Sequence, residues 1–198
     1  PIVRPKARRK NQPIPLPAEL RALLAVPLSP RLRLVRDVII DTGLRSSELC
    51  RATVGDLQEH PDGYYLAVTV KGGDESLTPL SPEIVEQLRD DLLARNMPAV
   101  GERLLVRADG TAWDKSTLNW FVRALGTKAG ITRFRLGPHK LRHLVANLAK
   151  DEVDPLTRSR LLNHASPATI AHYDHALPGE LRAARQAQRR ALLRYLGG

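Results

Sequence analysis

The stretch GPHKLRHLVANL, residues 137–148, predicts an amphipathic helix whose amino end is crowded with cations. Gly137 and Pro138 suit a helix start, because a proline at the first helical position removes only an amide that has no partner within the helix. Four basic side chains follow within five positions, namely His139, Lys140, Arg142 and His143. The amino end of a helix favours anions, so these cations oppose its dipole unless an anion lies among them. We interpret the stretch as an anion site and phosphate as its anion.

The composition indicates a globular, basic chain. A length of 198 residues suits one domain, or one domain with appendages, and 42% hydrophobic residues are enough for a core. The 31 Lys and Arg residues exceed the 21 Asp and Glu residues, giving a net charge of +10 that points to nucleic acid or another anionic surface. Aromatic residues make up only 4%, which argues against stacking of single strands and favours duplex DNA as the partner.

Nothing in the sequence indicates a membrane or an oxidising compartment. No apolar run approaches the roughly 20 residues of a transmembrane helix, and no signal-peptide pattern is present. The single cysteine, Cys50, has no internal disulfide partner and lies on the apolar side of a predicted helix. We therefore expect a cytoplasmic, nucleoid-associated protein in which Cys50 is a packing residue.

Changes in pattern divide the chain into three parts. Residues 1–16 carry basic residues and prolines without periodicity, and predict a linker or tail. Residues 17–178 are mostly helical in period, except that GYYLAVTVKGGDESLTPL, residues 63–80, predicts a β-hairpin around Gly72-Gly73. Residues 179–198 predict a basic amphipathic helix. The predicted fold class is mainly α with a small antiparallel β-sheet (α+β).

Start and stop signals place the helices within the main part. The expected segments are a helix from Pro17, a helix from Ser29-Pro30 to Gly43, RSSELCRATV (45–54), SPEIVEQLRDDLLARN (81–96), Asp114 to Ala129 before Gly130, a helix from Asp154-Pro155, and a short one from Ser166-Pro167 into Tyr173.

Each polar candidate taken alone has an ordinary structural explanation. Arg45 would be a surface or ion-paired arginine, and a tyrosine near a helix end, such as Tyr173, is usually half-buried packing. His139 and His143, four residues apart, could be zinc ligands, but no third ligand follows at a characteristic spacing.

The same residues taken together would suit phosphodiester chemistry. Two arginines can hold the oxygens of a phosphate, and nearby cations favour the phenolate form of a tyrosine. A lysine can protonate a departing hydroxyl, and histidines can move protons or donate to phosphoryl oxygens.

Four segments resemble the motif boxes of the tyrosine recombinase/phage integrase family, in that family's order and with similar separations. They are TGLRSSEL (42–49), VKGGDESLTPL (70–80), PHKLRH (138–143) and LLNHASPATIAHYDH (161–175). The resemblance covers about residues 30–177 and implies the catalytic-domain fold of that family, so residues 17–178 would be a catalytic domain. It implies six catalytic residues, namely Arg45, Lys71, His139, Arg142, His164 and Tyr173.

The resemblance also implies a role for each of these residues. Arg45 and Arg142 would hold the scissile phosphate, and Tyr173 would attack it to give a 3′-phosphotyrosyl link. Lys71 would be the general acid, and His164 would occupy the third box. His139 would open the His-x-x-Arg box. Two further residues would have supporting roles, Glu48 and His143.

This chemistry would require no cofactor, because the bond energy is kept in the phosphotyrosine. The sequence accordingly contains neither a G-x-x-x-x-G-K-[ST] loop nor a cluster of carboxylates for two metal ions. The resemblance implies duplex DNA as the partner and a tetramer on DNA, with the helix of residues 179–198 exchanged between protomers. Two alternatives remain for that helix: it folds back onto its own domain, or it binds DNA phosphates.

The sequence departs from the family pattern at two places. Asp74 and Glu75 follow Lys71 where family members often carry basic residues, and Asn163 replaces the glycine usual before His164. The family's N-terminal core-binding domain would precede residues 1–16, which resemble its linker. Two alternative functions therefore stay open: a non-catalytic DNA-binding module of the same fold, and a type IB topoisomerase or telomere-resolving enzyme.

Overall fold

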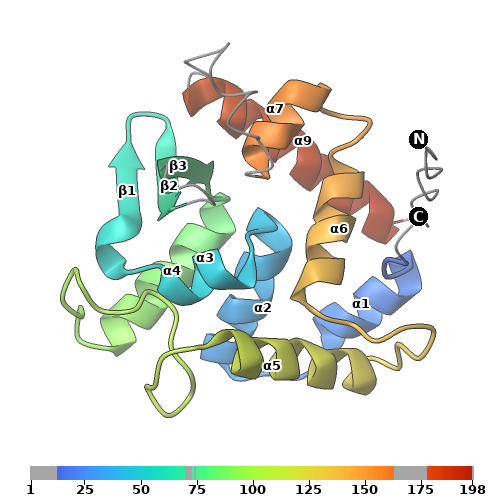
Figure 1. Ribbon diagram of the computed structural model, residues 1–198, viewed down its shortest axis with the longest axis horizontal. Helices are drawn as coiled ribbons and strands as arrows, with labels where there is room; N and C mark the ends of the chain where they lie inside the picture. Colours follow the sequence, from blue (N-terminus) through green and yellow to red (C-terminus); the bar gives the residue numbers. More distant parts are fainter. Residues whose placement is uncertain (1–12, 70–72, 74, 163–177, 198) are drawn as a thin grey trace, which may run out of the picture.

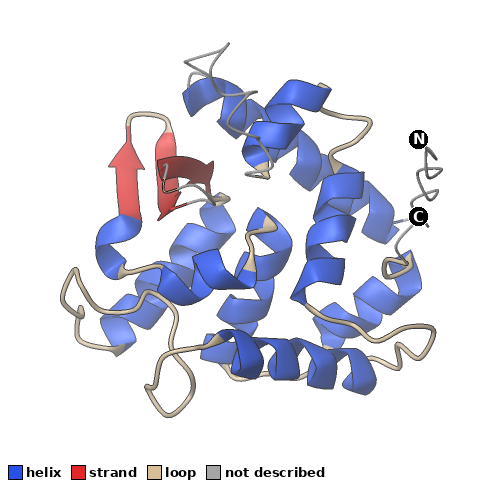
Figure 2. Cartoon of the chain, viewed as in Figure 1, coloured by secondary structure: helices blue, strands red, loops and turns tan. Residues whose placement is uncertain are grey.

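A computed structural model describes residues 13–69, 73, 75–162 and 178–197. This part of the chain is mainly helical, with one small sheet at one side of the molecule (Figure 1 and Figure 2). No helix among these residues is both long and apolar enough to cross a bilayer. The arrangement agrees with the predicted α+β class.

The described helices begin and end close to the predicted signals. Their bounds are α1 Pro17–Ala25, α2 Pro30–Thr42, α3 Ser46–Arg51, α4 Pro82–Ala94, α5 Lys115–Lys128, α6 Pro138–Leu148, α7 Pro155–Leu161 and α9 Pro178–Gly197. Proline is the first residue in six of them, where its fixed φ angle suits the helix and its missing amide costs nothing. The side chain of Asp114 caps α5 by accepting from the amides of Ser116 and Thr117. The predicted short helix from Ser166 lies outside the described residues.

The sheet is antiparallel and has the order β1-β2-β3. Its strands are β1 Leu57–His60, β2 Gly63–Thr69 and β3 Glu75–Pro79. The predicted hairpin is β2–β3, and Thr69 pairs with Glu75 next to its turn. β1 was not predicted, because its polar sequence LQEH shows no strand pattern.

The helix predicted over residues 45–54 is shorter than expected, because α3 ends at Arg51. Ala52 is extended, and its carbonyl accepts from the amide of Leu104, while Thr53 pairs with Arg103. A 3₁₀ turn, Val54–Asp56, then leads into β1. Pairing with a distant loop therefore ends this helix, and no local stop signal marks the place.

The core is built around α2, which lies at the centre of the fold (Figure 1). Four of its apolar side chains are at most 1% exposed: Leu34, Val35, Val38 and Ile39. Helices α4 and α6 pack against it. Cys50 is half-buried against the same core, and burial raises the pKa of its thiol to about 11. Its predicted role in packing is confirmed.

α9 packs against its own chain, where it contacts α7, β3, α1 and α6 (Figure 1). The hydroxyl of Tyr195 donates to the carbonyl of Pro15 at 2.7 Å, so α9 also lies beside the segment that enters α1. Leu193, one of the apolar residues of the amphipathic pattern, is 57% exposed. Exchange of this helix between protomers stays a prediction.

Candidate active site

The corner between α2 and α3 positions Arg45. Gly43 ends α2 in the left-handed region, with φ 63°, and its amide donates to the carbonyl of Ile39. The hydroxyl of Thr42 donates to the carbonyl of Val38 at 2.7 Å and accepts from the amide of Leu44 at 3.2 Å. These bonds fix the turn, so that Arg45 becomes the N-cap residue of α3.

Glu48 orients Arg45 through both of its carboxylate oxygens. Oε2 accepts from the backbone amide of Arg45 at 2.7 Å, and Oε1 accepts from Arg45 Nη1 at 2.6 Å. Only 2% of the Glu48 side chain is exposed, against 38% of the Arg45 side chain. A guanidinium has five N–H donors, so this pairing holds Arg45 in place without exhausting its capacity for an anion.

Arg142 joins three segments of the chain at the same corner. Its side chain extends from α6 and is 4% exposed. Nη1 donates to the carbonyl of Gly43 at 2.6 Å, and Nη2 donates to the carbonyl of Leu162 at the end of α7. Burial, together with the charge of Arg45, lowers the pKa of Arg142 to about 10. The group remains a cation at neutral pH, and a bound phosphate would relieve the repulsion between the two arginines.

His139 and His143 form a pair one turn apart on α6. Their Nε2 atoms lie 3.0 Å apart, and their rings meet edge to face, with centroids separated by 4.4 Å. At that distance one nitrogen donates and the other accepts, so the pair holds a single proton between the rings. Burial lowers the pKa of His143, as do the charges of His139, Lys140 and Arg142. Within the described ranges, no three His, Cys, Asp or Glu side chains are grouped to share a metal ion.

The lowered pKa of His143 predicts a loss of stability in mild acid. The folded chain binds this proton less readily than the unfolded chain, whose histidine has a pKa near 6.5. The free energy of unfolding should therefore fall as the pH drops below about 6.5, and the loss is complete below the folded pKa.

Urea unfolding of the wild type and of His143→Gln, at about pH 7.5 and about pH 5, measures this contribution. The variant is expected to lose less stability between the two pH values, because other titrating groups are common to both proteins. An equal loss in both would contradict the prediction.

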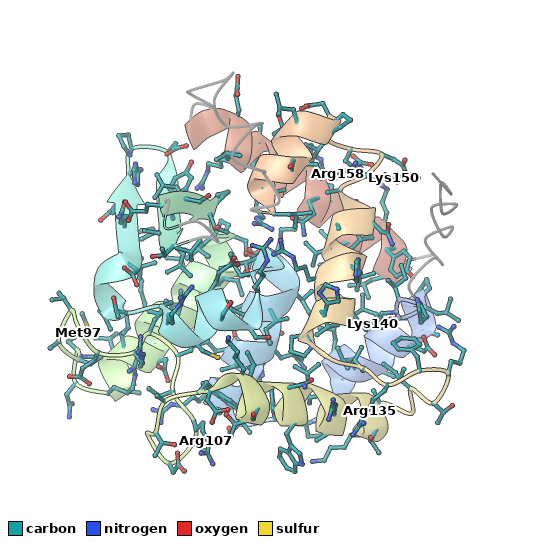
Figure 3. All side chains as sticks on the ribbon, viewed as in Figure 1. Met97, Arg107, Arg135, Lys140, Lys150 and Arg158 are labelled. Carbon is teal, nitrogen blue, oxygen red and sulfur yellow. The ribbon has the colours of Figure 1, made fainter. Side chains whose placement is uncertain are left out.

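Further basic side chains lie on α6, on α7 and in the segments that flank α6. Lys140 extends from α6, Lys150 follows that helix, and Arg158 lies on α7 (Figure 3). Arg158 Nη1 donates to the carbonyl of Lys150 at 3.4 Å, so the last two are neighbours. Arg135, labelled in the same view, lies in the loop between α5 and α6. α6, α7 and the segments that flank α6 therefore carry several cations besides Arg142.

The structure brings together five of the predicted site residues and leaves three undescribed. Arg45, Glu48 and Arg142 meet at the end of α2, and the histidine pair lies on the same helix as Arg142. The remaining three lie outside the described residues, namely Lys71, His164 and Tyr173. The last described residues before them in the chain are Thr69, at the end of β2, and Leu162, whose carbonyl accepts from Arg142.

Sequence reasoning missed Arg185 of α9, which is 2% exposed and donates to the carbonyls of Asp41 and Thr42. No arginine of residues 179–198 is among the site residues predicted from the sequence. A signal was available, because Arg185 and Gln188 fall on the same helical stripe as Leu181 and Leu192.

Comparison with known proteins adds independent information. A model described as the phage integrase family matches residues 16–180. The tyrosine recombinase XerH of Campylobacter jejuni is 31% identical over 157 residues, which cover 79% of this chain and 44% of XerH. More than half of that relative therefore has no counterpart here.

Two solved structures resemble the fold. A crystal structure of XerA recombinase matches with a TM-score of 0.66 at 28% identity, covering 94% of this chain and 67% of that one. A XerH site-specific recombinase bound to its difH substrate, in a pre-cleavage complex, matches with a TM-score of 0.63 at 26% identity. That match covers 80% of this chain and 47% of that one. The predicted fold is thereby confirmed.

Proposed function

The chain belongs to the phage integrase family of tyrosine recombinases, and from that membership we propose that it is a site-specific DNA recombinase. One observation carries the proposal: Arg45, held by Glu48, and the buried Arg142 converge on the corner after α2. Two guanidinium groups fixed in this way suit the non-bridging oxygens of a phosphodiester. Residues 17–178 would form the catalytic domain, preceded by a linker at residues 1–16.

The proposed reaction exchanges one phosphodiester for another. The phenolate oxygen of Tyr173 attacks the phosphorus, and the bond from phosphorus to the 5′-oxygen breaks. Lys71 gives its proton to that leaving oxygen, which becomes a 5′-hydroxyl, and a 3′-phosphotyrosyl link remains. A 5′-hydroxyl of another strand then attacks this link and gives its proton back to Lys71, and Tyr173 leaves as the phenolate. The number of phosphoester bonds is unchanged, so the exchange consumes no nucleotide.

The other described residues would act on the phosphate. Arg45 and Arg142 would neutralise the charge that develops on its oxygens, and each such donor is typically worth about 10²–10³ in rate. His139, exposed at the start of α6, would donate to a phosphoryl oxygen or move a proton, together with His164. His143 would support His139 through their shared proton. Glu48 would fix the direction of Arg45.

Duplex DNA is the proposed substrate and partner. The XerH structure that this chain resembles contains its difH substrate. The net charge of +10 and the cations around α6 and α7 favour a polyanion. A protein acting on chromosomal DNA would associate with the nucleoid. We further propose a tetramer on DNA in which α9 is exchanged between protomers, because a helix from a second copy could form the bonds that α9 makes in its own chain.

DNA binding is expected to weaken steeply with salt. Each phosphate neutralised by a lysine or arginine releases counterions, so the logarithm of the binding constant should fall with the logarithm of salt concentration by about 0.9 per phosphate. Fluorescence anisotropy of a labelled duplex over a sodium chloride series measures the slope. An affinity independent of salt would contradict duplex-phosphate binding.

Trapping of a covalent protein–DNA adduct tests the proposed function. The substrates are duplexes tiled across the genomic DNA that flanks the coding sequence, each with a nick that lets the 5′-hydroxyl fragment diffuse away after cleavage. A denaturing gel should show a protease-sensitive band that carries DNA label. Because the protein would be joined to a 3′-phosphate, a 5′-label on the scissile strand should shift and a 3′-label should not.

The same gel separates the alternatives. Salt-sensitive binding without any adduct would support a non-catalytic DNA-binding module, which the acidic residues Asp74 and Glu75 favour. Adducts and relaxation on any supercoiled plasmid, without a specific site, would support a type IB topoisomerase.

A further inference from the structure

The C-terminal end of α2 is capped by arginines from two other helices. The last carbonyls of an α-helix have no amide partner within the helix, and the helix dipole favours cations there. The carbonyls of Asp41 and Thr42 accept from Arg185 of α9. The next carbonyl, that of Gly43, accepts from Arg142 of α6. Three consecutive carbonyls are therefore bonded by two buried guanidinium groups.

Arg185 connects this helix end to the sheet and to α9. Its Nε donates to the carbonyl of Pro79 at the end of β3, at 3.2 Å. Its Nη1 also donates to Gln188 Oε1 at 2.6 Å, and Gln188 Nε2 lies 3.4 Å from the carbonyl of Asp41. Both side chains are at most 2% exposed. A planar guanidinium can reach carbonyls in several directions at once, whereas a lysine ammonium presents donors from a single point.

The capped carbonyls lie directly before the residues that form the proposed phosphate site. Arg45 follows Thr42 by three residues, and the carbonyl of Gly43 between them is bonded to Arg142. The bonds of Thr42 to Val38 and Leu44 make this turn rigid, so a shift of the helix end would be passed on to Arg45. Arg45 and Arg142 would therefore move relative to each other if the bonds from Arg185 to the end of α2 were lost.

We propose that Arg185 is a positioning residue. It couples the packing of α9 against the end of α2 to the positions of Arg45 and Arg142. The proposal rests on the proposed function for its effect on cleavage, and on the structure alone for its effect on the α2–α3 corner. α9 begins at Pro178, five residues after Tyr173, so the helix that carries the cap begins close in the chain to the predicted nucleophile. The cap acts in the same way whichever copy of the chain supplies α9.

The first test measures hydrogen exchange at the α2–α3 corner and does not depend on catalytic activity. Arg185→Lys keeps a cation but loses the planar set of guanidinium donors. Arg190→Lys is the matched control on the exposed side of the same helix. Hydrogen exchange followed by mass spectrometry reports on the amides of Leu44 and Arg45, which bond to Thr42 and Glu48. We expect exchange at these amides to speed up by at least about tenfold in Arg185→Lys and to be unchanged in Arg190→Lys.

The second test asks whether the effect passes through the phosphate. Single-turnover cleavage at saturating DNA is compared on an ordinary scissile phosphate and on a methylphosphonate, which lacks the negative charge that two arginines neutralise. Arg185→Lys should slow the ordinary substrate by about 10- to 100-fold, because small displacements of positioning groups cost that much. The methylphosphonate should be slowed much less, and the Kd for DNA should stay near the wild-type value.

A second variant covers the case in which Arg185→Lys does not fold. Gln188→Ala removes one partner of Arg185 and of the Asp41 carbonyl but leaves the buried cation, and should give changes of the same sign and smaller size. Unchanged exchange at the corner in both variants would overturn the proposal. Equal slowing on the two substrates would also overturn it, since a loss of folded protein does not depend on phosphate charge. Faster exchange in a chain whose wild type forms no adduct would support the cap and refute the proposed function.

Discussion

Replacing Tyr173 with phenylalanine is expected to abolish the covalent protein–DNA adduct while leaving DNA binding intact. Phenylalanine has the same ring but lacks the oxygen that would attack the phosphorus, so no phosphotyrosyl link can form. Binding should persist, because phosphate contacts come from lysine and arginine side chains elsewhere on the surface. The denaturing-gel assay and an anisotropy titration on the same nicked duplex measure the two properties side by side.

Tyr64→Phe is the matched control for this substitution. The Tyr64 hydroxyl accepts from Arg89 Nη2 of α4 at 2.9 Å, a contact that involves neither Arg45 nor Arg142. This variant should form the adduct at the wild-type rate. An adduct formed equally by Tyr173→Phe would remove Tyr173 as the nucleophile, and loss of adduct in both variants would indicate an effect on folding.

Replacing Gly43 with alanine is expected to lower the free energy of unfolding by about 2–5 kcal/mol. Residue 43 has φ 63°, a conformation that costs an alanine about 1–2 kcal/mol. A Cβ atom there would lie 2.8 Å from Val145 Cγ1 and 3.3 Å from Leu162 Cδ2, so α6 or the end of α7 would have to shift. Overpacking of this kind typically costs about 1–3 kcal/mol more.

The displaced helix also carries Arg142, so the same variant should slow adduct formation by about 100-fold even where it is folded. Gly130→Ala is a fitting control, because residue 130 has φ 72° and a Cβ atom there would meet nothing within 4 Å. Urea unfolding of both variants separates backbone strain from steric contact. An equal loss of stability in the two would show that Val145 and Leu162 give way at no cost.

Local signals explain why the helix bounds could be predicted. Ser29-Pro30 and Gly43 bracket α2, and Asp114 and Gly130 bracket α5, because caps and left-handed glycines act through neighbouring residues. The end of α3 could not be predicted in this way. It is determined by the bond from the Leu104 amide to the carbonyl of Ala52, between residues far apart in the sequence.

The candidate site likewise contains residues that the sequence indicated and contacts that only the structure shows. The motif boxes indicated Arg45, Glu48 and Arg142, and the structure shows how they meet, through the carboxylate of Glu48 and the carbonyl of Gly43. The roles of Lys71, His164 and Tyr173 stay predictions. The helical stripe indicated that Arg185 is buried, but its partners could not be assigned from sequence, because they are backbone carbonyls that any residue could supply.

The cap on α2 has a consequence for the order in which the molecule is assembled. The bond from Arg185 to the carbonyl of Asp41 spans 144 positions of the chain. During synthesis, α2 therefore leaves the ribosome long before Arg185 is made. Contacts between such distant segments also form late in folding. A nascent or partly folded chain would carry Arg45 on an unfinished helix end. The proposed strand cleavage would then be withheld until synthesis and folding of the domain are almost complete.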